Sequence, residues 1–134
     1  MRLILLLFFI ISTIYPKSIT GYDLYRSLNK KSSLNIADRN QYISATAYIM
    51  GVINALKFSR DIYENVIAND SKETNQEKRM GNYLMPLNKE WSQNQYVEIV
   101  HFYLRGNPTK LNLSAVEIIS LSLFEVSILN SLKL

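Results

Sequence analysis

The apolar residues of this chain recur every three or four positions over long stretches, and this helical spacing is what most constrains its fold. The clearest stretch lies within residues 38–56, where one helix face carries Tyr42, Ala45, Ile49, Val52, Ile53 and Leu56. An apolar face of this kind is buried against other helices in a folded protein. The spacing therefore predicts an all-α protein, built as a compact bundle of about four helices.

Three capping boxes indicate where helices begin. In this motif a hydroxyl side chain and an acidic or amide side chain three residues later each accept a hydrogen bond from the other residue's backbone amide. The pairs are Thr20 with Asp23, Ser92 with Gln95, and Ser114 with Glu117. They predict a short first helix through Asn29, a third helix that ends at residues 106–108, and a last helix that is apolar on almost every side.

The second helix is predicted to follow a polar loop at residues 30–35, with Asp38 as its capping residue. Small residues repeat at every fourth position along it, at Ala47, Gly51 and Ala55. Two readings of this repeat are open. The small residues leave a shallow groove where a neighbouring helix approaches closely, or they simply fit a crowded core.

The first 20 residues have the order of a signal peptide. Arg2 gives a positive start, residues 3–14 form an apolar run, and Pro16 ends any helix there. A helix of that run is about 18 Å long, whereas a hydrocarbon core is about 30 Å thick, so no permanent membrane span is expected. Cleavage near Gly21, or alternatively after Ser18, is predicted to release a single domain, residues 21–134, into the periplasm.

The chain contains no cysteine, which removes disulfides, thiolate nucleophiles and the commonest zinc ligands. Of its 15 Lys and Arg residues, Arg2 and Lys17 lie in the predicted leader, so the remaining 13 nearly balance the 11 acidic residues. The other basic residues do not form the dense basic stripe of nucleic-acid-binding proteins. No nucleic-acid partner is expected.

The sequence offers few parts for catalysis. His101 is the only histidine, and the acidic residues are not spaced as metal ligands. No serine lies in a Gly-x-Ser-x-Gly turn, and there is no glycine-rich phosphate loop. The prediction is a protein that is not an enzyme, with no catalytic residue, cofactor or metal. A small hydrolase with His101 as general base is the alternative, whereas the nine tyrosines and Trp91 favour binding to another protein.

Short motifs follow one another in a fixed order along the chain, namely Gly21-x-x-Leu24, Tyr48-Ile49-x-Gly51-Val52, Met85-Pro86, Ser92-x-x-Gln95, Tyr103-Leu104 and Asn107-Pro108. In this order and spacing the chain resembles the Tai family, the immunity proteins of type VI secretion amidases. The resemblance covers nearly all of the predicted mature chain. It implies an exported helical protein, often a homodimer, that binds and inhibits a cognate peptidoglycan amidase effector in the periplasm.

The chain departs from the family pattern in its lack of cysteines. The family usually carries disulfide-forming cysteines near the positions of Leu28, Ala45 and Met85. Loss of one such bridge typically costs about 2 to 4 kcal/mol. We therefore expect these substitutes to be buried, in a cysteine-free variant of the pattern.

The polar stretch from Asp61 to Asn82 is longer than the family pattern suggests, and the second helix is expected to fray there. Residues 69–79 then form either an exposed loop or a solvated extension of the helix. We expect partner-specific contacts in this part of the chain. The candidate partner-binding residues are Tyr83, Trp91, Asn69, Asp70, Lys72 and Glu73.

Two binding functions are compatible with the sequence. The first is a periplasmic immunity protein that inhibits one peptidoglycan amidase toxin of a type VI secretion system. The second is a periplasmic structural or chaperone-like helical protein without a dedicated toxin, which is expected to bind many unfolded clients weakly.

Overall fold

The structure is a computed structural model that describes residues 18–69 and 91–131. Its elements are α2 (Gly21–Leu28), α3 (Ile36–Asn69), α5 (Gln93–Gly106), the 3-10 helix η1 (Pro108–Lys110) and α6 (Ala115–Ser131). Within these ranges the only β contact is a single antiparallel bridge between Thr20 and Ser114. The predicted all-α fold with about four helices is confirmed.

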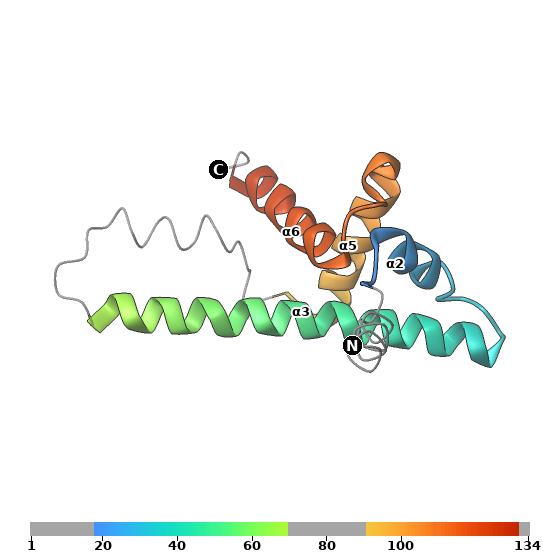
Figure 1. The fold of residues 1–134 in the computed structure, drawn as a ribbon, viewed down its shortest axis with the longest axis horizontal. Coiled ribbons are helices and arrows are strands. Elements are labelled where there is room, and N and C mark those ends of the chain that lie inside the picture. Colours follow the sequence, from blue (N-terminus) through green and yellow to red (C-terminus); the bar gives the residue numbers. More distant parts are fainter. Residues whose placement is uncertain (1–17, 70–90, 132–134) are drawn as a thin grey trace, which may run out of the picture.

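The long helix α3 is the base of the bundle. The other three α-helices lie on one side of it, and its last turns extend beyond them (Figure 1). Among the described helices, α2 packs on α3, and α5 packs on α6, α2 and α3. No helix in the described ranges is both long and apolar enough to span a membrane.

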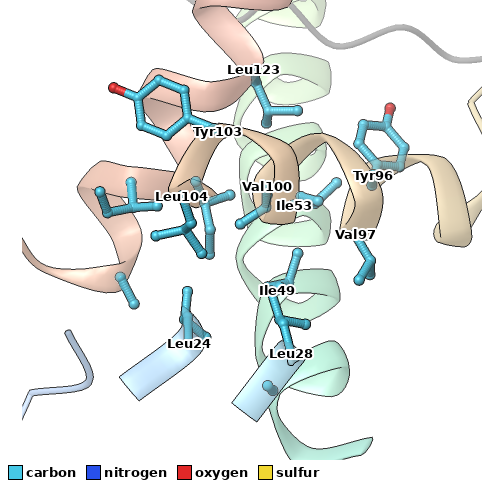
Figure 2. Close-up of a cluster of buried hydrophobic side chains, with 14 residues drawn as sticks. Leu24, Leu28, Ile49, Ile53, Tyr96, Val97, Val100, Tyr103, Leu104 and Leu123 are labelled. Atoms are coloured by element: carbon cyan, nitrogen blue, oxygen red, sulfur yellow. The ribbon is translucent and has the colours of Figure 1, made fainter. Parts of the chain in front are cut away.

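The core forms where the four helices meet. Figure 2 shows Leu104 of α5 above Leu24 of α2, and Ile49 of α3 beside Leu28 of α2. The predicted apolar face of the second helix is confirmed, since Ala45, Ile49 and Ile53 are buried and its other three members pack partly against the core. Leu28 and Ala45, two of the three residues that we expected to be buried in place of cysteines, are both buried, whereas Met85 lies outside the described residues.

All three predicted capping boxes are present. The Thr20 and Ser92 hydroxyls each accept a bond of 3.3 Å from the backbone amide three residues later, and so does the Ser114 hydroxyl. The reciprocal bonds from the capping residue's own amide to the Asp, Gln or Glu side chain measure 2.7 to 3.0 Å. Each helix start is therefore fixed by its own local sequence, as predicted.

The prediction that Asp38 caps the second helix is wrong. The helix begins three residues earlier, at Ile36, and the Asn35 side chain accepts a 2.8 Å bond from the amide of Ala37. Asp38 instead accepts bonds from Lys30, at 2.6 Å, and from the hydroxyl of Ser33, at 2.9 Å. These bonds hold the pKa of Asp38 below its usual value and close the loop between α2 and α3.

The second helix is also longer than predicted. It does not fray at Asp61 but continues to Asn69, for 34 residues in all. Polar composition alone does not end a helix, because residues 61–69 contain neither proline nor glycine. The rest of the polar stretch, residues 70–82, lies outside the described residues.

The small-residue repeat on α3 faces away from the core. Ala47, Gly51 and Ala55 are all exposed, and no heavy atom of the described chain would lie within 4 Å of a Cβ placed on Gly51. The expectation of a crowded core at these residues is therefore wrong. The reason is that α2, α5 and α6 all pack on the opposite face of α3.

The last helix, α6, is buried on only one side. Ala115, Ile118, Ile119 and Leu123 are fully buried, as expected for a helix that is apolar almost all round. Outward-facing apolar residues of the same helix, including Leu121 and Leu129, are exposed. An apolar surface of α6 thus reaches solvent in the described structure.

Candidate functional site

The residues proposed from sequence as partner contacts are only partly described. Trp91 is half-buried and packs edge-on against Tyr96, with 5.5 Å between ring centroids, so part of it belongs to the core. Asn69 is the last residue of α3. Tyr83, Asp70, Lys72 and Glu73 lie outside the described residues, and the role of all six in partner binding stays a prediction.

His101 is a structural contact between α5 and the end of α2. Its Nε2 lies 3.0 Å from Oδ1 of Asn29, and its ring centroid is 6.4 Å from that of Tyr25. The side chain of His101 is only partly exposed, because the C-terminal end of α2 covers one side of it. Burial is the main cause that lowers the pKa of His101, with Arg105 and Lys31 acting in the same direction and Glu98 opposing them.

A concave surface lies between α5 and α6, and we call it the Phe102 hollow. It encloses about 230 Å³ and is lined by Ile99, Phe102, Tyr103, Gly106, Asn107, Ser122, Glu125, Val126 and Leu129. Phe102 is 72% exposed and Leu129 is 53% exposed, so an aromatic and an aliphatic side chain stand open to solvent at one site.

Phe102 and Leu129 are exposed because other residues of α5 and α6 take the core-facing positions. On α5, Val100, Tyr103 and Leu104 take the core-facing positions, which leaves Phe102 on the outer side between Glu98 and Arg105. On α6, Leu129 continues the exposed row of Glu117, Leu121 and Glu125, which repeats every four residues. The hollow is the groove between these two outward rows.

Two charged residues lie at or near the Phe102 hollow: Glu125 lines it, and Lys110 contacts Tyr103, which also lines it. Lys110 donates a 2.9 Å hydrogen bond to the hydroxyl of Tyr103, and its ammonium lies 5.2 Å from the centre of that ring. This bond is the main cause that raises the pKa of Lys110, and the negative charge of Glu125 acts in the same direction. An apolar centre with charged groups around it is the usual composition of a protein-binding surface.

Sequence reasoning missed Phe102. Phe102 lies on the polar side of the third helix, one helical turn from Glu98 and from Arg105. A large aromatic residue among charged residues on a helix surface was the available signal, because such a residue gains little from folding at that position.

A second hollow, of about 300 Å³, lies between α2 and α3. Its lining mixes apolar residues such as Leu24 and Tyr48 with Asn40, Gln41 and Ser44. Asp23, the acidic residue at its wall, is already engaged in the capping box of α2. This hollow offers polar contacts but no exposed aromatic side chain.

No family model, curated protein or solved structure matches this chain. Within residues 18–69 and 91–131, no group of three or more His, Asp or Glu side chains is placed to hold a metal ion. The described fold and site define a small helical bundle with a largely apolar hollow between α5 and α6.

Proposed function

We propose that this chain is a periplasmic immunity protein that binds and inhibits a peptidoglycan amidase toxin of a type VI secretion system. The order of a signal peptide and the motif order that resembles the Tai family support the class of function. The single observation that carries a binding role is the Phe102 hollow, where a 72% exposed phenylalanine stands beside exposed Leu129.

The composition of the hollow suits contact with an enzyme's surface. Aromatic anchors at the centre of an interface supply most of its binding energy when neighbouring contacts exclude water. Phe102 and Leu129 would supply that centre, while Lys110 and Glu125 at the rim would pair with charges of the amidase. Rim charges of this kind speed association and select the partner more than they raise affinity.

The second candidate is the structural or chaperone-like helical protein. The observation that favours it is the amount of apolar surface on α3 and α6 that solvent reaches, which suits weak contacts with many unfolded clients. A panel of unfolded client proteins separates the two functions. A chaperone binds many of them weakly, whereas an immunity protein binds one folded amidase tightly.

The test uses the exported chain recovered from the periplasm and a panel of peptidoglycan amidase toxins. We expect saturable nanomolar binding to one amidase. Phe102→Ser should then weaken that binding by about 2 kcal/mol or more, roughly 30-fold, because the anchor is removed from the centre of the contact.

The matched control is Phe58→Ser. Phe58 is 67% exposed and lies on α3, outside the Phe102 hollow, so its replacement removes a similar amount of exposed aromatic surface elsewhere. It should leave amidase binding unchanged. Equal loss in both variants, or no amidase bound by the unaltered protein, would count against the proposal.

A further inference from the structure

The hollow between α2 and α3 has the size and the lining of a site for a small molecule. It encloses about 300 Å³, which is at the lower end of the range for clefts that hold such ligands. We call it the Ser44 hollow. It shares no lining residue with the Phe102 hollow, so a ligand bound there is independent of the proposed amidase contact.

Small side chains leave this space open where the two helices meet. Ser27 lines it from α2, and Ser44 and Ala45 line it from α3. A helix contact shaped for stability alone carries larger apolar side chains at such positions, because a gap between packed elements forfeits van der Waals contacts. The short side chains therefore keep a hollow in a place where the core could have continued.

The lining of the Ser44 hollow is apolar inside and polar at the opening. Leu24 is 2% exposed, Ala45 is 7% exposed and Tyr48 is half-buried, so these three form its inner part. Asn40 and Ser44 also line it and are exposed. An apolar wall with a few polar groups that orient the ligand is the usual composition of a small-molecule site.

The polar side chains of the lining have unused hydrogen-bonding groups. Within the described residues, the side chains of Ser27, Asn40 and Ser44 make no hydrogen bond to the rest of the chain. Gln41 accepts a 2.6 Å bond from Lys30 through its Oε1, which leaves its Nε2 as a donor. Hydroxyl and amide groups together donate and accept, so the opening suits a ligand that does both.

The charged groups beside the hollow are already engaged. Asp23 lines it, but its carboxylate accepts bonds of 3.0 and 2.8 Å from the amide and the hydroxyl of Thr20. Lys30, which contacts Gln41, forms an ion pair of 2.6 Å with Asp38. A charged ligand would have to compete with these bonds, whereas an uncharged ligand would leave them intact.

We propose that the Ser44 hollow binds a neutral sugar unit of a glycan, with the sugar ring against Tyr48 and its hydroxyls bonded to Asn40 and Ser44. Sugar hydroxyls both donate and accept, and the C–H face of a sugar ring is apolar, so both parts of the lining are matched. A purely apolar ligand would cover the polar side chains without giving them partners, which costs free energy.

The test is a titration of the exported, ¹⁵N-labelled chain with two neutral trisaccharides, followed by NMR. One is the trimer of N-acetylglucosamine, which represents N-acetylated cell-wall glycans, and the other is maltotriose, which represents plain glucans. We expect saturable shifts with at least one of them, centred on the amides of α2 and of residues 40–48, and the stronger binder identifies the source. No saturable shift with either sugar, or shifts centred elsewhere, would overturn the proposal.

A variant that fills the hollow checks the location. Ser44→Phe should abolish sugar binding, because its ring occupies the space of the ligand. The matched control is Ser59→Phe, at an exposed position of the same helix outside both hollows, and it should bind sugar as the unaltered protein does. Circular dichroism verifies that both variants keep their helical content.

A second pair of variants checks the polar contact. Asn40→Ala should weaken sugar binding about fivefold, the usual effect of one lost hydrogen bond, whereas the exposed Asn54→Ala control should not. Full sugar binding by both Ser44→Phe and Asn40→Ala would overturn the proposal. Ser44→Phe should still inhibit the amidase, so failure of the sugar site and failure of the immunity function are seen separately.

Discussion

The backbone amide of Ala115 donates a 2.8 Å hydrogen bond to the carbonyl oxygen of Ile19, which ties the segment before α2 to the first residue of α6. The next residues continue this attachment. The amide of Gly21 donates to the carbonyl of Leu113, at 2.9 Å, and that of Tyr22 to the carbonyl of Leu111, at 2.8 Å. Residues 19–22 are therefore tied to residues 111–115, the segment that leads into α6.

This attachment distinguishes the two predicted cleavage positions of the leader. A cut after Thr20 would remove the capping box of α2, at a cost of about 1 kcal/mol, together with the Ile19–Ala115 bond. A cut after Ser18 keeps both. We predict that the mature chain begins at Ile19, which the intact mass of the exported protein will establish. A mature chain that begins at Gly21 would contradict this prediction.

The same attachment leaves little space around Gly21. A Cβ on this residue would lie 3.0 Å from the Ile118 side chain and 3.1 Å from the backbone oxygen of Leu111. Gly21→Ala should lower the free energy of unfolding by about 1 to 3 kcal/mol, because backbone cannot move aside as a flexible side chain can. Chemical denaturation measures this change.

The control for that measurement is Gly106→Ala. Gly106 also lies in a helix, but no heavy atom would be within 4 Å of its Cβ. The substitution should leave stability unchanged or raise it by up to about 1 kcal/mol. Equal effects of the two alanines would show that the close packing at Gly21 is not the cause.

The stability of the fold should depend on the protonation of His101. Its pKa in the folded chain is lowered from the ordinary value of 6.5, mainly by burial, so the unfolded chain binds the proton more tightly. Stability is therefore highest above pH 6.5 and decreases as the pH falls below it. Glu98, whose pKa is lowered chiefly by its bond to Lys31, adds a separate loss below about 4.5.

The variant His101→Gln isolates the histidine contribution. Its amide retains a donor for Asn29 but does not titrate, so its stability should fall less than that of the unaltered protein between pH 7 and pH 5. Thermal unfolding of both proteins across this range measures the difference. Parallel curves would contradict a histidine held neutral by the fold.

The sequence was most informative where structure is decided locally. The capping boxes at Thr20, Ser92 and Ser114 were predicted correctly, because each involves hydrogen bonds between residues three apart. The buried face at Ala45, Ile49 and Ile53 was also predicted, because one helix's periodicity reveals which of its faces is apolar.

The features that the sequence did not reveal depend on how helices pack on one another. The pattern at Ala47 and Gly51 was compatible with a groove and with a crowded core, and only the placement of α2, α5 and α6 shows that they are exposed. Phe102 was missed for the same reason, since its partners in the hollow, Val126 and Leu129, come from a separate helix.

The most direct test of the proposed function is a titration of peptidoglycan cleavage by the cognate amidase with the exported protein. We predict that cleavage falls linearly and reaches zero at a fixed molar ratio, as expected for tight binding that blocks the enzyme. The Phe102→Ser variant should need far higher concentrations for the same effect. Undiminished cleavage at saturating concentrations, for every amidase in the panel, would contradict the immunity function.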